Sequence, residues 1–147
     1  HLEKLIHNHI NQYEYLKNNN ALLQTIPGVG PVLSRYMLIV LGGRTFQSAS
    51  QCAAYLGLVS IQNESGSSLR GRSRISKAGS PVIRAKLYMA TISALQHNPD
   101  IKIQNQRLLK NGKSKMSALC AAMRKLVQIC FGVIKHQQPY HVQAKFL

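Results

Sequence analysis

The 147-residue chain is long enough for one domain with a single hydrophobic core, and its 45% hydrophobic content excludes a wholly disordered protein. Its charge is unusual, because 19 Lys and Arg residues face four acids and give a formal net charge of +15. After Glu64, the only acid is Asp100, so nearly all of the positive excess lies in residues 65–147. A domain this basic usually binds a polyanion, and we expect nucleic acid rather than an acidic membrane surface.

The three cysteines, Cys52, Cys120 and Cys130, form no C-x-x-C pair. Two apolar helical patterns contain them, so we predict small buried thiols in a reducing compartment. No Cys/His spacing is typical of zinc, and neither a signal peptide nor a run of about 18 apolar residues is present. We therefore expect a cytoplasmic protein with no membrane contact.

Apolar residues recur at three- and four-residue spacing from Leu2 to Leu16, which predicts an amphipathic helix ending near Lys17. Three asparagines, Asn18–Asn20, are predicted to break the chain after it. The chain opens inside a helical pattern without Met, so we expect residues 1–21 to be a lead-in helix at the end of an interdomain linker. The alternative is a helix that belongs to the core.

A Pro-Gly-Val-Gly turn at residues 27–30 separates a short helix from a longer apolar helix that ends near Leu41. This is the pattern of a helix-hairpin-helix motif, in which glycines let the backbone approach closely and the second helix points its first N–H groups at a DNA phosphate. We predict nucleic-acid contacts at Gly28, Val29 and Gly30. The alternative is an ordinary turn without a ligand.

Capping residues mark most of the later helices. Ser48 and Gln51 form a capping box, Ser80-Pro81 and Asn98-Pro99 begin two further helices, and Asn111-Gly112 is a helix-ending signal. The longest helix is predicted from Ser114 or Lys115 to about Lys135, with Lys113, Lys115, Arg124 and Lys125 on a basic outer face.

The predicted fold class is mainly α. We expect a helical domain over residues 22–137 with a helix-hairpin-helix motif and at most one short β-hairpin, in which Leu58–Gln62 pairs with Arg72–Ser76. The tail, residues 138–147, is expected to be poorly ordered.

The stretch from Asn63 to Arg84 has few apolar side chains and combines small hydroxyl residues, glycines and cations. Such a composition suits chemistry on a phosphate or the clamping of one. The alternative is a flexible basic loop that lies on nucleic acid. The residues predicted to contact nucleic acid in this stretch are Arg70, Arg72, Arg74, Ser76, Lys77 and Arg84.

Several short motifs in one order resemble a known family. They are I-P-G-V-G, A-A-Y-L-G-L at residues 53–58, E-S-G, I-S-K-A-G at residues 75–79, Gly112-Lys113 and a final helix with R-K-L. Together they resemble the C-terminal transposase domain of the DEDD insertion-sequence transposases, kin of the Piv-type DNA invertases. The resemblance covers about residues 22–135.

The resemblance implies that a serine of this domain attacks DNA and forms a covalent serine–phosphate link. The family serine precedes a glycine and matches Ser65, with Ser67 and Ser68 as nearby alternatives. The loop before I-S-K is about one residue longer than the family pattern. Arg70, Arg72, Arg74 and Lys77 could neutralise the phosphate but could not remove the proton of Ser65.

The resemblance also implies partners outside these residues. A RuvC-like domain of the same protein would carry four acids and bind a divalent metal, expected to be Mg²⁺, and a structured guide RNA would select the DNA. No acidic tetrad exists in this chain, so the domain itself is expected to bind no cofactor and to be inactive alone. A bacterial protein that forms a homo-oligomer at full length is expected.

A second hypothesis is a non-catalytic basic module that binds DNA or RNA. Both hypotheses predict salt-dependent binding, and only the first requires the hydroxyl of Ser65.

Overall fold

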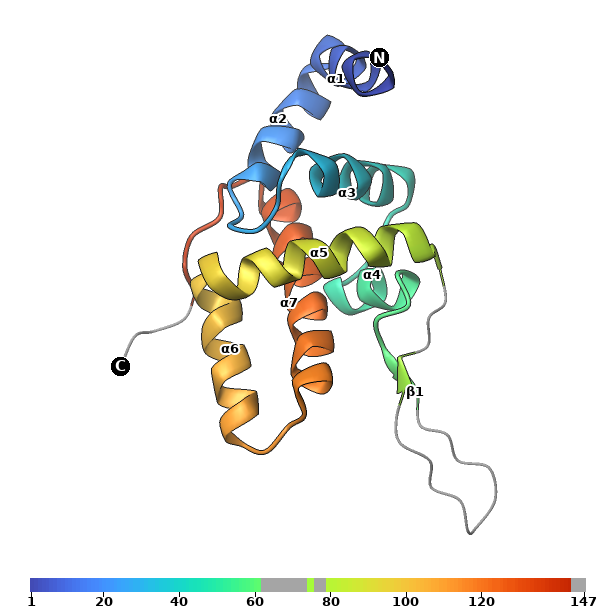
Figure 1. The fold of residues 1–147 in the computed structure, drawn as a ribbon. Coiled ribbons are helices and arrows are strands. Elements are labelled where there is room, and N and C mark those ends of the chain that lie inside the picture. The colour runs from blue at the N-terminus through green and yellow to red at the C-terminus, as the bar shows by residue number, and fades with distance from the viewer. Residues whose placement is uncertain (62–73, 76–78, 144–147) are drawn as a thin grey trace.

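The computed structural model describes residues 1–61, 74–75 and 79–143, and this part of the chain is mainly helical, as predicted (Figure 1). Its helices are α1 (Leu2–Gln12), α2 (Glu14–Gln24), α3 (Pro31–Gly43), α4 (Ala49–Tyr55), α5 (Pro81–His97), α6 (Pro99–Lys110) and α7 (Lys115–His136). The strands β1 (Ser60–Ile61) and β2 (Arg74–Ile75) have two residues each.

Helix α7 is the centre of the domain. It packs against α2, α4, α5 and α6, and seven of its residues are buried. By length and composition alone α7 could also cross a membrane. Its burial among four other helices is the pattern of a core helix.

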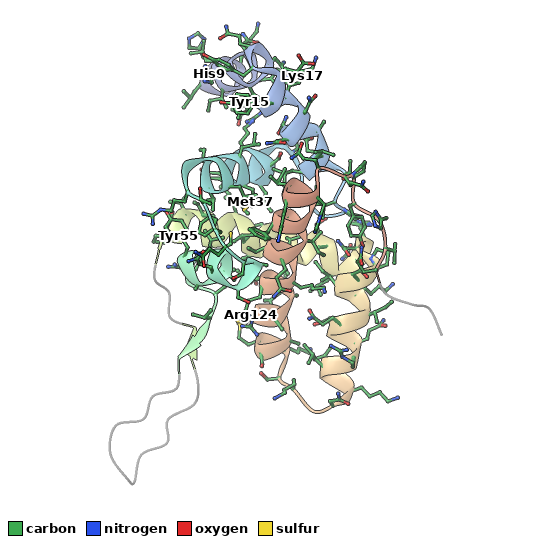
Figure 2. All side chains as sticks on the ribbon, turned by 180° about the vertical axis from the view of Figure 1, so that it is seen from behind. His9, Tyr15, Lys17, Met37, Tyr55 and Arg124 are labelled. Carbon is green, nitrogen blue, oxygen red and sulfur yellow. The ribbon has the colours of Figure 1, made fainter. Side chains whose placement is uncertain are left out.

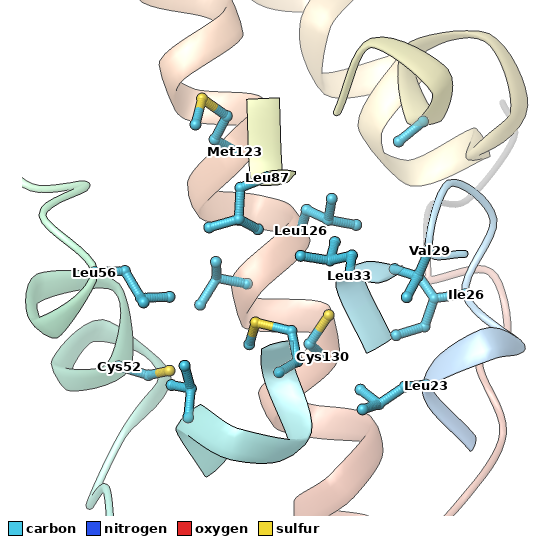
Figure 3. Close-up of a cluster of buried hydrophobic side chains, with 14 of the residues drawn as sticks. Leu23, Ile26, Val29, Leu33, Cys52, Leu56, Leu87, Met123, Leu126 and Cys130 are labelled. Atoms are coloured by element: carbon cyan, nitrogen blue, oxygen red, sulfur yellow. The ribbon is translucent and has the colours of Figure 1, made fainter. Parts of the chain in front are cut away.

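The core forms where side chains from α2, α3, α4 and α5 converge on α7 (Figure 3). Each fully buried Leu or Ile stabilises the fold by about 1.5–3 kcal/mol. Its buried residues include Leu23, Ile26, Leu33, Leu56, Leu87, Leu126 and Cys130.

The helix ends follow the predicted caps. Ser48 Oγ accepts the N–H of Gln51 at 3.1 Å, and Gln51 Oε1 accepts the N–H of Gln47 at 2.7 Å. The side chains of Ser80 and Ser114 likewise each accept a backbone N–H three residues later and so cap α5 and α7. At the end of α6, Gly112 has φ of +87° and Lys113 N–H donates to the Leu108 carbonyl at 3.0 Å, which is a Schellman ending.

The predicted antiparallel pairing is confirmed for two residues on each side, whereas Leu58 and Val59, which were predicted to belong to the first strand, lie outside it. Strands β1 and β2 are antiparallel, with Ser60 opposite Ile75 and Ile61 opposite Arg74. Leu58 lies before β1 and is fully buried.

The predicted break at Asn18–Asn20 is wrong. The chain bends instead at Tyr13, whose φ and ψ of −114° and 118° are extended, and the asparagines lie inside α2. Asn20 Oδ1 accepts a 2.6 Å hydrogen bond from Ser34 Oγ of α3, and Asn19 Oδ1 accepts one of 3.0 Å from Gln137 Nε2. These tertiary contacts override the low helix propensity of asparagine.

The expectation of a poorly ordered tail is wrong for residues 138–143. Helix α7 ends at His136, the φ of 52° at its C-cap Gln137 is left-handed, and the following residues turn back toward the start of α6. Backbone and side-chain hydrogen bonds hold them there, as described below.

The three cysteines are free, and Cys52 and Cys130 are buried as predicted, whereas Cys120 is half-buried. Burial raises the pKa of the Cys52 thiol to about 11. Burial, with Cys52 nearby, raises the pKa of Cys130 to about 12. Both thiols therefore stay protonated at neutral pH and behave as small apolar side chains.

Alkaline pH is expected to destabilise the fold. Because the folded pKa values of Cys52 and Cys130 lie above the ordinary value of 9.0, their contribution to stability is complete below pH 9 and is lost as the pH rises through 11 to 12. Urea unfolding at several pH values should show a falling midpoint above pH 9. The double variant Cys52→Ala/Cys130→Ala should be less stable throughout but should show a flatter decline. A decline of equal steepness in both proteins would contradict this assignment.

Candidate nucleic-acid interface

The turn between α2 and α3 is closed by its own backbone. Ile26 N–H donates to the Leu23 carbonyl at 3.2 Å, and Val29 N–H donates to the Ile26 carbonyl at 3.0 Å. The side chains of Ile26 and Val29 are buried in the core. Any contact of Val29 with a nucleic acid would therefore involve its backbone.

Gly28 is required by packing against α5. Its φ is +101°, and a Cβ built on it would lie 2.6 Å from the Cβ of Ala94. A real Cβ cannot occupy that position, so the close backbone approach at Gly28 is toward α5. Its predicted contact with nucleic acid stays a prediction.

Gly30 is in a different environment. It is exposed, its φ of −95° is ordinary, and a Cβ built on it would meet nothing within 4 Å. It is the N-cap of α3, with no side-chain cap, and Pro31 is the first helical residue. Helices α1 and α2 also begin without a side-chain cap, whereas side chains cap α4, α5, α6 and α7. The first amides of α3 therefore meet the requirements for holding a phosphate.

The stretch with the predicted serine lies mostly outside the described residues. Ser65, Arg70, Arg72, Ser76 and Lys77 are not described, and Arg74 is described only through its backbone in β2. The two ends of this stretch are described, at β1 with β2 and at the start of α5.

The start of α5 is a tightly packed turn. Gly79 has φ of +86°, and a Cβ built on it would collide with the carbonyl oxygen of Tyr55 at the end of α4. Ser80 Oγ then caps the helix by accepting the Ile83 N–H at 3.3 Å. Arg84, predicted to contact nucleic acid, is half-buried and donates from Nη1 to the Gly79 carbonyl at 3.4 Å. The guanidinium thus stabilises this turn.

Arg124 anchors the other end of the same stretch. It was expected on the basic outer face of α7, but it is half-buried and its Nη1 donates to the Leu58 carbonyl at 3.2 Å (Figure 2). This hydrogen bond joins the core helix to the chain two residues before β1. No sequence signal distinguishes Arg124 from the neighbouring Lys125, because its partner is a backbone group 66 residues away.

Exposed cations gather at the turn between α6 and α7. Arg107, Lys110, Lys113 and Lys115 are all exposed there, and residues 101–143 contain no acid. In Figures 1 and 2 this turn and β1 lie toward the same end of the molecule, opposite α1. Four exposed cations without a neighbouring acid therefore lie toward the same end of the molecule as β1.

The described residues do not fit a metal site. They contain no group of three or more His, Cys, Asp or Glu side chains that could hold an ion. Asp100 is buried and accepts hydrogen bonds from Tyr140 and Gln143.

Comparison with known proteins places the chain among transposases. The family model described as "Transposase IS116/IS110/IS902 family" matches residues 20–106. The pilin gene-inverting proteins of Moraxella lacunata and Moraxella bovis are each 35% identical over 133 residues. The match covers 89% of this chain and 41% of each relative, so the chain spans about two fifths of the length of these curated relatives.

Proposed function

Because this chain belongs to the Transposase IS116/IS110/IS902 family, we propose that it is the DNA-binding and serine-bearing domain of an RNA-guided DNA recombinase. The family match over residues 20–106 carries the proposal, because it spans both the hairpin turn and the stretch with Ser65. The relatives are named for inverting a pilin gene, which is a DNA rearrangement. Transposition or inversion of DNA is therefore the proposed activity of the whole protein.

Ser65 is the proposed nucleophile. Its Oγ would lose its proton and form a bond to a DNA phosphorus while one P–O bond of the backbone breaks, and the leaving deoxyribose oxygen would take up a proton and become a free hydroxyl. The phosphodiester is thereby kept as a serine–phosphate link, which that hydroxyl or another strand end can attack to rejoin the DNA. Arg70, Arg72, Arg74 and Lys77 would neutralise the phosphate. The packing of Gly79 on Tyr55 supports this role, because it holds one end of the stretch against the core.

The remaining parts of the reaction would come from partners. A RuvC-like domain of the same protein would provide four acids and the divalent metal that they bind. The described residues of this chain contain no group of three or more His, Cys, Asp or Glu side chains that could hold such an ion. A guide RNA would choose the DNA, and the full-length protein would act as a homo-oligomer in the bacterial cytoplasm. This domain alone is expected to be inactive.

The hairpin between α2 and α3 would hold the DNA backbone. Gly30 leaves space at the start of α3, and the amides there have no side-chain cap. A phosphate oxygen would satisfy them and would also be stabilised by the helix dipole. This is the helix-hairpin-helix mode of binding, which needs few cations.

A non-catalytic DNA- or RNA-binding module is the second candidate. The exposed cations at the turn between α6 and α7 favour it, because they would bind a polyanion whether or not Ser65 reacts. The two candidates differ in the effect of removing the Ser65 hydroxyl.

The chain is expected to bind duplex DNA or structured RNA with an affinity that falls steeply with salt. Cations that neutralise phosphates release counterions, so affinity should drop at least about tenfold between about 50 and 200 mM salt. Fluorescence anisotropy over a salt series gives the slope. Lys113→Ala and Lys115→Ala should each reduce that slope by up to about one.

Lys4→Ala is the matched control, because Lys4 is an exposed lysine of α1 at the opposite end of the molecule. It should leave the slope unchanged. An affinity that stays flat with salt would eliminate both candidate functions.

A further inference from the structure

Asn98 lies at the centre of a buried polar network. Its side chain is fully buried, and its Oδ1 accepts the N–H groups of Asp100 and Ile101 at 3.1 and 3.3 Å, which caps α6. Its Nδ2 donates to the carbonyl of Pro27 at 3.2 Å, across 71 residues of sequence. The cap of α6 is therefore tied directly to the turn between α2 and α3.

The segment after α7 completes this network. Tyr140 OH lies 2.6 Å from Asp100 Oδ2 and 3.1 Å from Asn98 Oδ1, and the shorter, charge-assisted hydrogen bond to Asp100 is the stronger of the two. Gln143 N–H donates to both carboxylate oxygens of Asp100 at 3.1 Å. Burial and Asp100 raise the pKa of the Tyr140 hydroxyl, so it remains a donor at physiological pH. Asp100 is thus the acceptor that holds the tail in place.

The same tyrosine also contacts the turn. Its backbone N–H donates to Thr25 Oγ1 at 2.9 Å, and that hydroxyl donates to the Leu22 carbonyl at 2.6 Å. The turn is consequently held at three successive places: Thr25 by the tail, Pro27 by Asn98, and Gly28 by its packing on Ala94. Because α3 begins three residues after Gly28, the position of this turn decides where the first amides of α3 point.

We propose that Asn98, Asp100 and Tyr140 are positioning residues, which clamp the turn at residues 25–28 so that the start of α3 is presented to a nucleic-acid phosphate. This inference rests on the proposed function. The clamp needs no contact with the nucleic acid itself. It links the C-terminal segment of the domain to binding at the hairpin.

Tyr140→Phe tests the clamp, because it removes one oxygen and keeps the ring. In the 147-residue chain, the hydrogen exchange of the Val29 and Ser34 amides, which donate to the Ile26 and Gly30 carbonyls, should become faster, while that of α7 core amides stays unchanged. Affinity for a DNA duplex should fall by about threefold to tenfold, the effect of one hydrogen bond. The salt slope should not change, because no cation is removed, and this distinguishes the clamp from a direct phosphate contact.

Tyr88→Phe is the matched control, because Tyr88 is an exposed tyrosine of α5. It should change neither exchange nor affinity. Asp100→Asn provides a second variant, which weakens both tail contacts and should reproduce the effect of Tyr140→Phe. If Asp100→Asn does not fold, the result for Tyr140→Phe decides alone.

Unchanged exchange at Val29 and Ser34 in Tyr140→Phe would overturn the inference. Faster exchange with unchanged duplex affinity would also overturn it, because the turn would then not be presented to nucleic acid. If the unmodified chain binds neither duplex DNA nor structured RNA at low salt, the proposed function fails. The exchange measurement would then still decide whether the tail clamps the turn.

Discussion

Ser65→Ala in the full-length protein is expected to abolish DNA strand exchange while leaving DNA and RNA binding nearly intact. Removal of a catalytic nucleophile lowers rates by at least about a thousandfold, because no other group can form the covalent intermediate. The hydroxyl contributes little to an interface dominated by Arg and Lys, so binding should change by less than about threefold. A recombination assay with the guide RNA and divalent metal, run beside a binding assay, measures both quantities.

Ser67→Ala and Ser68→Ala are the controls, since they remove neighbouring hydroxyls of the same loop and should have milder effects. A covalent protein–DNA adduct, trapped on a nicked substrate and mapped by mass spectrometry, would identify the reacting residue. An adduct on Ser67, Ser68 or Ser76 would move the nucleophile to that residue. Normal recombination by Ser65→Ala, with no adduct on any serine, would leave the chain as a non-catalytic binding module.

Gly28→Val is expected to cause the largest loss of stability among the hairpin variants. A valine at φ of +101° is strained, and its Cβ would overlap Ala94 of α5, where a built Cβ lies at 2.6 Å. The two effects together should cost about 3–5 kcal/mol, a large part of the stability of a domain this size. Thermal unfolding should show a melting temperature lower by about 10 °C or more.

Gly30→Val is the matched variant for binding. Its φ of −95° suits any residue, and nothing lies within 4 Å of the built Cβ, so stability should change by less than about 1 kcal/mol. The added side chain would shield the first amides of α3, and duplex affinity should fall while the melting temperature holds. A stable Gly30→Val chain that binds as tightly as the unmodified chain would show that this turn is only structural. Equal stability of Gly28→Val and the unmodified chain would contradict the packing described for α5.

Local patterns in the sequence were sufficient for most of the secondary structure. Ser48 with Gln51, Ser80 with Pro81, and Asn111 with Gly112 act on backbone groups within a few residues, so their effect can be predicted without the fold. The apolar periodicity likewise predicted a mainly helical domain, and the order of short motifs indicated the transposase family.

The sequence-based predictions were wrong where a side chain forms a hydrogen bond with a residue distant in the sequence. Asn20 continues α2 because it meets Ser34, and Arg124 is half-buried because it donates to the Leu58 carbonyl. The tail through Gln143 is ordered because Asp100 accepts its hydrogen bonds. Propensity cannot predict such contacts, because each depends on a position that only the packed core creates.

The sequence by itself determined the composition of the candidate site: an excess of cations after residue 64, a serine beside a glycine, and a Pro-Gly-Val-Gly turn before an apolar helix. The tertiary structure decided what the parts of that turn do. It placed Gly28 against α5 and left Gly30 open, although both are glycines of one motif. It also brought Asn98 and Tyr140 to the turn, because the burial of α6 and α7 in one core places their ends beside the end of α2.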